Sequence, residues 1–291
     1  MKHAILGAGG VGGLIGASLG HSGESVTLVV RRDALGKYPS QLHVESPFGK
    51  FDAPVTVASE VPPVDVLWVT VKAPQLEPAL ASFRDGRQVR AIVPLLNGID
   101  HVSLLRARYG ADRVIPATIS VESERVSPGR IVHRSPFAQV NVASSGRTLL
   151  QGTIDQLQKI GFACQFMDDE QTLMWSKLVF LAPLALATSA AGKTIGELRA
   201  DSSLQQQLET CVREACSVAG AEGAKVDAED VIATIRGLPR PMRSSMQKDV
   251  EQGRLPELDA IGGPILRGAE RHHLEVPTTR KLVAAVERKT R

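Results

Sequence analysis

The stretch that decides the fold is residues 2–12, KHAILGAGGVG, in which a short apolar run leads directly into a glycine-rich turn. Its spacing matches the dinucleotide-binding fingerprint G-x-G-x-x-G, in which each glycine has its own task. Gly7 permits the tight turn after the strand, Gly9 lets the backbone approach a pyrophosphate, and Gly12 lets the next helix pack on the sheet. With Gly10, these glycines are the predicted cofactor-binding residues of the turn, because a helix N-terminus attracts an anion.

The surroundings of the motif strengthen this prediction, since a lone G-x-G-x-x-G is weak evidence and is often only a turn. Small and apolar residues follow it over 14–19, as expected of a buried helix, and a second apolar run comes at 26–30. That order and distance are typical of a βαβ unit. We therefore expect a nucleotide site at the start of this sequence.

The end of the second predicted strand indicates which dinucleotide is bound. An enzyme that uses NAD places Asp or Glu there to accept from the ribose 2′-hydroxyl, whereas this chain has Arg31 and Arg32. A carboxylate would repel a 2′-phosphate, and a guanidinium binds it with paired, charged hydrogen bonds. The sequence therefore favours NADPH as the cofactor, held by Arg31. The alternative is that the two arginines belong to an ordinary solvated loop.

Composition narrows the class of protein. With 291 residues the chain is long for one core, so two domains are expected. Its 34 Lys and Arg nearly balance 31 Asp and Glu, and no basic tract predicts a nucleic-acid partner. The three cysteines, Cys164, Cys211 and Cys216, form no C-x-x-C pair and suit a reducing cytosol. We expect a cytoplasmic protein with no metal site, no signal peptide and no apolar segment long enough to cross a membrane.

The hydrophobic pattern changes along the chain and predicts two domains, 1–167 and 168–291. The predicted strands of the first domain are 2–6, 26–30, 42–45, 52–57, 64–71, 90–96 and 114–115, followed by an antiparallel extension at 119–122, 130–133 and 138–142. The predicted helices of the second domain are a long apolar one from about Asp169 to Gly192, and then 203–219, 228–236, 246–252, 259–272 and 278–289. The fold class is therefore α/β, a doubly wound Rossmann-type domain followed by a mainly helical one.

Polar residues that follow the predicted strands are candidates for binding, because ligands of open α/β sheets bind at the carboxyl ends of the strands. Lys72 follows one such strand and could reach a cofactor phosphate. Asn97 follows another, and its amide could hold the ribose or nicotinamide end of the cofactor, or the substrate. The plainer alternatives are that Lys72 ends a loop and that Asn97-Gly98 is an ordinary turn.

Two further candidates lie in the predicted helical domain. Lys177 sits in the apolar segment MWSKLVFL, where desolvation would lower the pKa of the ammonium and make it a usable acid. Such a lysine also often only extends its charge to solvent. Glu257 and Asp259 interrupt another apolar segment, which taken alone is a helix N-terminus with acidic residues.

Taken together, these residues resemble the ketopantoate reductase family, whose members reduce 2-dehydropantoate to pantoate with NADPH. The features that carry the resemblance span nearly the whole chain: G-x-G-x-x-G at 7–12, Arg31, Lys72, LNG at 96–98, WSKL at 175–178, GEL at 196–198, SSM at 244–246 and Glu257-x-Asp259. The resemblance implies that Lys177 is the general acid, that Glu257 holds the substrate hydroxyl and helps to place Lys177, and that Ser245 binds the substrate carboxylate. It implies a role in pantothenate biosynthesis.

One departure from the family pattern concerns the substrate. Members carry asparagines four and eight residues after the catalytic lysine, where this chain has Leu181 and Ala185. An apolar wall leaves a substrate hydroxyl without a partner, which costs about 1–3 kcal/mol. The expected substrate is therefore ketopantoate or a related, less polar 2-oxo acid. Thr188, eleven residues after Lys177, is a candidate to supply the missing contact.

The sequence thus predicts an NADPH-dependent reductase of a small-molecule 2-oxo acid, with the active site where the two domains meet. Two alternatives stay open: a reductase of another ketone or an imine on the same scaffold, and an NADP(H)-binding regulatory protein without turnover. A homodimer is one of the assemblies open to the chain.

Overall fold

The computed structural model describes residues 1–83 and 86–290, which form two compact units. The first unit comprises Met1–Leu96 and His101–Glu170, and the second comprises Asn97–Asp100 and Gln171–Arg291. The second unit thus begins three residues beyond the predicted boundary at 167/168. It also takes in Asn97–Asp100, which the sequence interpretation had placed in the first domain.

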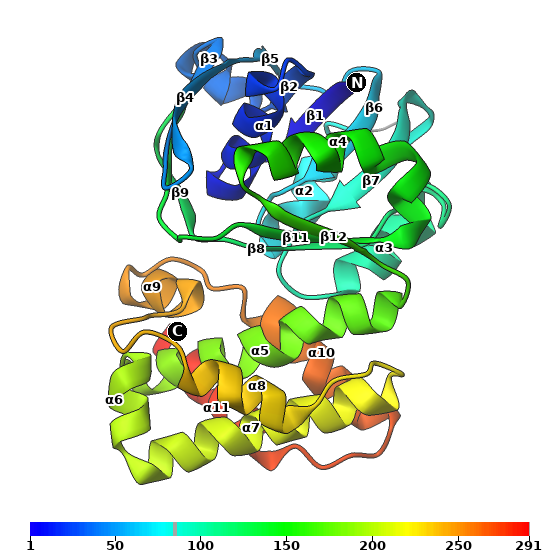
Figure 1. The fold of residues 1–291 in the computed structure, drawn as a ribbon. Helices are drawn as coiled ribbons and strands as arrows, with labels where there is room; N and C mark the ends of the chain where they lie inside the picture. The colour runs from blue at the N-terminus through cyan, green and yellow to red at the C-terminus, as the bar shows by residue number, and fades with distance from the viewer. Residues whose placement is uncertain (84–85, 291) are drawn as a thin grey trace. The chain divides into compact units, whose positions relative to one another are not determined.

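The centre of the first unit is a five-stranded parallel sheet in the order β5-β2-β1-β6-β7 (Figure 1). Its strands are β1 (Lys2–Leu6), β2 (Ser25–Val29), β5 (Thr56–Ala58), β6 (Val64–Val69) and β7 (Val89–Pro94). The neighbours of β1 are β2, with Lys2 opposite Ser25, and β6, with His3 opposite Val66. Parallel strands covered on both faces form apolar runs, and β6 is buried at nearly every position. The predicted Rossmann-type class is confirmed.

Helix α1 (Gly10–His21) connects β1 to β2, as a βαβ unit requires. It contacts both the parallel sheet and the strands of a second sheet, so every residue from Gly12 to Gly20 is buried. A helix enclosed on both sides is apolar all around, which explains its run of Gly, Ala, Leu and Ile.

Two smaller sheets complete the first unit and correct several predicted strands. The second sheet has the order β4-β3-β10-β9 and the third has the order β12-β11-β8. Their strands are β3 (Gln41–Ser46), β4 (Gly49–Pro54), β8 (Ala117–Ser120), β9 (Ser123–Ser127), β10 (Arg130–His133), β11 (Gln139–Ala143) and β12 (Ala163–Met167). The predicted single strand 52–57 is in fact the end of β4 and the start of β5, in different sheets. The predicted strand 114–115 is only an isolated bridge from Val114 to Ile92.

The extension predicted as antiparallel is mixed. The pairs β8–β11 and β9–β10 are antiparallel, but β10 also pairs with β3, and β11 with β12, in parallel. The remaining helices of the unit are α2 (Leu76–Leu80), α3 (Asp100–Tyr109, which begins in the second unit) and α4 (Arg147–Ile160). The sequence interpretation had missed β9, β12 and α4.

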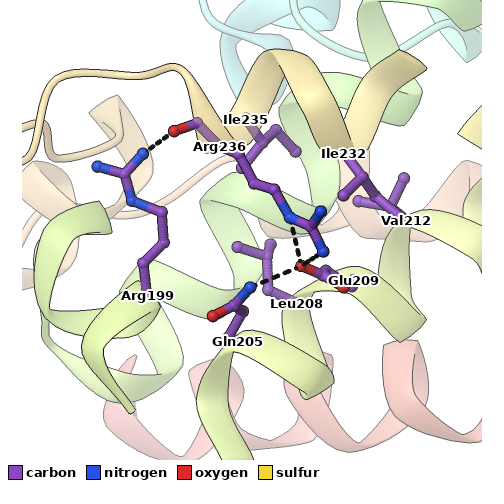
Figure 2. Close-up of a pocket in the computed structure, with 8 residues that line it drawn as sticks. All are labelled: Arg199, Gln205, Leu208, Glu209, Val212, Ile232, Ile235 and Arg236. Carbon is purple, nitrogen blue, oxygen red and sulfur yellow. Dashed lines mark hydrogen bonds and ion pairs between the residues drawn. The ribbon is translucent and has the colours of Figure 1, made fainter. Parts of the chain in front are cut away.

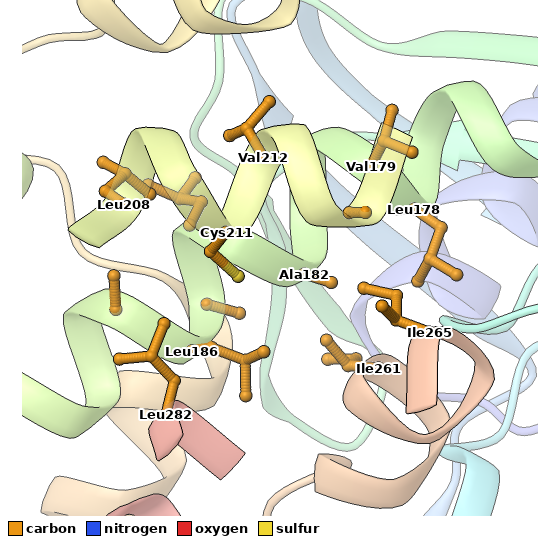
Figure 3. Close-up of a cluster of buried hydrophobic side chains, with 14 of the residues drawn as sticks. Leu178, Val179, Ala182, Leu186, Leu208, Cys211, Val212, Ile261, Ile265 and Leu282 are labelled. Carbon is orange, nitrogen blue, oxygen red and sulfur yellow. The ribbon is translucent and has the colours of Figure 1, made fainter. Parts of the chain in front are cut away.

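The second unit is a bundle of helices around one apolar core (Figure 3). Its helices are α5 (Glu170–Ala191), α6 (Ile195–Ala200), α7 (Ser202–Ala221), α8 (Ala228–Arg236), α9 (Ser245–Glu251), α10 (Leu258–Arg271) and α11 (Pro277–Thr290). The predicted helices are present within one or two residues, and α6 is an addition. In Figure 3, Leu178, Ala182 and Leu186 of α5 lie among side chains such as Cys211 and Ile261.

Polar residues define where these helices begin and end. Thr194 forms a capping box with Glu197 at the start of α6, and Asp201 and Asp227 cap α7 and α8. Helix α5 ends before Gly192, which adopts φ +67° as predicted for a stop signal.

Helix α5 corrects the expectation that no segment is apolar enough to cross a membrane. Its 22 residues have the length and hydropathy for such a span, but 72% of the apolar window is buried inside the protein. That burial is typical of the core helix of a folded unit, and it explains the apolar setting of Lys177.

Candidate active site

The glycine turn of the first unit has the shape that a dinucleotide phosphate requires. Gly7 adopts φ +108°, and Thr70 holds the turn by donating to its carbonyl oxygen at 2.8 Å. A Cβ on Gly12 would overlap the Gly7 carbonyl, so helix and strand approach as the motif predicts. A Cβ on Gly9 would meet nothing within 4 Å, and α1 has no side-chain cap at its start. Open space above uncapped N–H groups suits a pyrophosphate.

Three side chains that the sequence interpretation had missed support this turn. Tyr38 donates to the Ala8 carbonyl at 3.0 Å, and Arg125 of β9 donates to the Tyr38 hydroxyl. Ser123, also on β9, donates to the Gly10 carbonyl at 3.0 Å. No local sequence signal marks them, because they come from strands of the second sheet and the loop before it. Gly10 itself is needed for this approach, since a Cβ there would overlap Ser123.

The two predicted cationic contacts follow the carboxyl ends of β2 and β6, the two strands that pair with β1. Arg31 follows β2 and exposes 87% of its side chain, with its guanidinium 3.6 Å from Asp33. Lys72 is an exposed residue three positions after β6. An exposed guanidinium after the second strand fits the 2′-phosphate of NADP(H), so the residues present fit the cofactor that the sequence predicts.

The second unit brings Lys177, Asn97 and Glu257 together. Lys177 of α5 donates from Nζ to Oδ1 of Asn97 at 3.0 Å, and Asn97 donates from Nδ2 to Oε2 of Glu257 at 2.9 Å. An ammonium only donates and a carboxylate only accepts, so these partners define which way the amide points. Three residues far apart in sequence thus form one chain of hydrogen bonds.

Burial and the nearby carboxylate set the pKa of the Lys177 ammonium. Desolvation lowers the pKa of Lys177 to about 8, while the negative charge of Glu257 acts in the opposite direction. Glu257 is only 8% exposed and precedes α10, but its side chain caps no helix N–H. Glu257 and Asp259 do lie at the N-terminal end of α10, as the plainer alternative has it, but the Glu257 carboxylate accepts from Asn97 and not from a helix N–H. A lysine with a pKa near neutrality is suited to donate a proton.

Thr188 and Ser245 occupy different places from each other. Ser245 is exposed at the start of α9, whereas Thr188 is fully buried on α5. The Thr188 hydroxyl donates to the Leu184 carbonyl at 2.7 Å and lies 2.8 Å from the hydroxyl of Ser244. Ser244 in turn caps α9 by accepting from Gln247 N–H at 3.1 Å. The arrangement suits Thr188 as a support for the residue before Ser245 better than as a substrate contact.

Three other features of the described residues are poor candidates for a site: a small cavity, the arrangement of metal-binding side chains and the thiol of Cys211. A cavity of about 10 Å³ between α6, α7 and α8 has room for one water at most, and Arg236 and Gln205 fill its rim by donating to Glu209 (Figure 2). Within residues 1–83 and 86–290, no three His, Cys, Asp or Glu side chains gather to hold a metal. Burial raises the pKa of the Cys211 thiol to about 12, so it is a packing residue and not a nucleophile.

A dinucleotide-binding sheet followed by a helical unit with a partly buried lysine and asparagine and a buried glutamate is the make-up of a two-domain oxidoreductase. The model of the family described as ketopantoate reductase PanE/ApbA matches residues 3–146, and its C-terminal counterpart matches residues 169–290. The chain belongs to the ketopantoate reductase family, which confirms the resemblance seen in the sequence.

Relatives match along their full length. A 2-dehydropantoate 2-reductase of Caulobacter vibrioides is 30% identical, with 97% of this chain and 96% of the relative covered. The crystal structure of a PanE/ApbA family ketopantoate reductase from Ralstonia eutropha has a TM-score of 0.87 at 23% identity, covering 100% and 98% of the two chains. A D-mandelate dehydrogenase bound to NADH and anilino(oxo)acetate has a TM-score of 0.86 at 23% identity, again covering 100% and 98%.

Proposed function

We propose that the protein reduces a 2-oxo acid with NADPH, and that Lys177 is the proton donor. The observation that carries this proposal is the hydrogen-bonded chain of Lys177, Asn97 and Glu257 in the second unit. A regulatory protein that only binds the cofactor would have no need of an ammonium buried at this cost beside a carboxylate.

The cofactor has a distinct set of holders in the first unit. The N–H groups that begin α1, near Gly9 and Gly10, would bind the pyrophosphate, and Arg31 would bind the 2′-phosphate, with Lys72 as a further cation. When bound, NADPH supplies the hydride that reduces the keto carbon. Asn97 also stays a predicted contact of the cofactor or the substrate.

The residues of the second unit would handle the charge and the proton. The Lys177 ammonium holds the keto oxygen, neutralises the negative charge that develops on it, and donates the proton that completes the alcohol. Asn97 directs Nζ by accepting one of its three hydrogens. The Glu257 carboxylate favours the protonated form of Lys177 and accepts a hydrogen bond from the substrate hydroxyl, and Ser245 binds the substrate carboxylate.

We infer that the preferred substrate has an apolar group on the keto carbon. Leu181 is partly buried against the helical core and Ala185 is fully buried, so neither position offers a polar partner to the substrate. Each methylene buried on such a wall favours binding by about 0.8 kcal/mol. The D-mandelate dehydrogenase among the similar folds adds an aromatic 2-oxo acid to the compounds worth testing.

The test is a panel of 2-oxo acids scored by the loss of NADPH absorbance. It contains ketopantoate, its analogues without the hydroxyl, branched aliphatic 2-oxo acids and phenylglyoxylate, with a simple ketone and an imine as comparisons. We expect turnover with the 2-oxo acids and almost none in the Lys177→Ala variant. Tight NADPH binding with no turnover on any compound would instead support the regulatory protein.

We place this activity in the cytoplasm. Cys164, Cys211 and Cys216 are free thiols, as expected in a reducing compartment where NADPH is the common reductant. A homodimer stays a prediction.

A further inference from the structure

The segment Asn97–Asp100 lies between β7 and the rest of α3. It belongs to the second, helical unit, although the residues on both sides of it belong to the first unit. Every residue of it makes a different contact with that unit. Asn97 bonds to Lys177 and Glu257, and Ile99 packs on the helical core. Gly98 adopts φ +82°, and a Cβ there would overlap the carbonyl oxygen of Ala260. The segment is therefore seated closely on the start of α10.

The last residue of the segment is held by an arginine of α10. Arg267 forms an ion pair with Asp100 through Nη2, and with Asp259 through Nη1 at 2.7 Å. One guanidinium thus binds a carboxylate of the segment and a carboxylate of the first turn of α10. The planar fork of an arginine suits this double contact, which a single ammonium makes less well.

The sequence of α10 makes room for this contact. A Cβ on Gly263 would lie 2.5 Å from Nη2 and 2.6 Å from Nη1 of Arg267, so the guanidinium lies back over a glycine one turn before its own residue. Glu257, Ala260, Gly263 and Arg267 recur at intervals of three and four residues, which places them along one side of α10. That side is where the segment lies.

We propose that Arg267 is a positioning residue that fastens Asn97–Asp100 to α10 and thereby holds the Asn97 amide between Lys177 and Glu257. The proposal rests on the proposed function, in which Lys177 donates a proton. The ion pairs themselves are partly exposed, with 41%, 55% and 86% of the Arg267, Asp100 and Asp259 side chains open to solvent. Exposed pairs add little to overall stability, so their effect on Asn97 is separable from an effect on folding.

The test uses two variants that release the segment by different routes. Arg267→Gln removes the charge, and Gly263→Ala keeps the charge but displaces the guanidinium. The second variant adds a good helix former at a buried position, and its melting temperature is measured beside kcat to separate a loss of function from a loss of folding. Arg267→Lys restores one cation. The control is Arg271→Gln, which breaks an ion pair of the same helix with Glu222, away from the segment.

We expect Arg267→Gln and Gly263→Ala to lower kcat about 10- to 100-fold, as a small misplacement of a reacting group does. NADPH affinity and melting temperature should match those of Arg271→Gln, and Arg267→Lys should recover part of kcat. A unit that loses only general rigidity would instead show a lower melting temperature and no recovery with lysine.

A second measurement does not need turnover. The titration of Lys177 is followed by NMR of protein that carries lysine labelled with carbon-13 at Cε. Both variants should titrate at lower pH than the unmodified protein, because the buried ammonium has lost the Asn97 acceptor. An unchanged or raised pKa together with unchanged kcat would overturn the proposal. If Lys177→Ala keeps full turnover, the proposed function fails, while this titration still decides whether Arg267 positions Asn97.

Discussion

Lys177 donates a hydrogen bond to Asn97 across 3.0 Å, although 80 positions separate the two residues in the sequence. The Asn97 amide links the ammonium to the carboxylate of Glu257, to which it donates at 2.9 Å. This bond occupies one hydrogen of Nζ, and in the proposed function another hydrogen binds the keto oxygen of the substrate. The lysine is thus directed as well as charged.

The first prediction concerns the proton donor. Lys177→Ala should cut turnover by about 10²–10⁴, the usual contribution of a positioned acid, with NADPH affinity nearly unchanged. Because the acid form is the active one, the rate of the unmodified protein should fall as pH rises through about 8, the pKa of Lys177. Steady-state rates across this range check it, and a flat profile up to pH 10 or so would assign the proton to another group.

Cofactor preference depends on the exposed guanidinium after β2. Arg31→Asp should weaken NADPH binding by about 1.5–3 kcal/mol, roughly 10- to 100-fold, and narrow or reverse the preference over NADH. The matched control is Arg32→Asp, since Arg32 instead pairs with Glu60 at 3.1 Å. Fluorescence titration of both cofactors measures the ratio. Equal affinity of the unmodified protein for NADH and NADPH would contradict the assignment.

Substrate preference is predicted to follow Leu181. Leu181→Asn should raise kcat/KM for ketopantoate relative to its apolar analogues, by about one to two decades, because the amide can pair the hydroxyl. Ala185→Asn is expected to change stability and not substrate preference. Ala185 is fully buried in the helical core, so an amide there should mainly lower the melting temperature. If the unmodified protein already prefers ketopantoate strongly, a water or the Glu257 carboxylate alone is enough to pair the hydroxyl.

Much of the fold could be predicted because its signals are local. The glycine turn, the apolar strands and the helical spacing after Asp169 each depend on neighbouring residues, and the structure has them within a few positions. The small sheets could not be assigned in this way. In β3 and β4 the pairing partner decides the sheet, and no local pattern distinguishes a strand of the central sheet from one that pairs with β10.

In the candidate site, too, the individual residues could be predicted from local sequence signals, whereas their contacts could not. Lys177, Asn97 and Glu257 were found separately, by an apolar setting, a strand end and an interrupted apolar run. Their contact depends on tertiary structure. Arg267 and Gly263 carry no signal of their own, since an arginine and a glycine on a helix are ordinary residues. Thr188 was predicted as a substrate contact from its spacing to Lys177, but spacing does not reveal that the side chain is fully buried beside Ser244.

The hydroxyl pair of Thr188 and Ser244 gives a separate test of α9. Because Thr188 donates to the Leu184 carbonyl, the Ser244 hydroxyl can donate to Thr188 while accepting from Gln247 N–H. Thr188→Val and Ser244→Ala should each cost about 1 kcal/mol of stability, and the double variant less than the sum, because the two share one hydrogen bond. Denaturant unfolding measures the cycle. Additive losses would show that the hydroxyls do not depend on each other.

The last prediction concerns acid stability and His3 of β1. This side chain is fully buried and accepts from Trp68 Nε1 at 3.2 Å, and burial lowers the pKa of its ring to about 4. An unfolded chain binds the proton near pH 6.5, so between pH 6.5 and about 4 the unfolded state takes up more protons than the folded one. Stability should therefore fall as pH falls through this window, by up to about 3 kcal/mol from this group.

The test variant is His3→Gln, which keeps an acceptor for Trp68 but does not titrate. The control is His43→Gln, which changes an exposed histidine of β3. Urea unfolding at several pH values measures the slope. An equal slope in the unmodified protein and in His3→Gln would show that the pKa of His3 is the same in the folded and unfolded states.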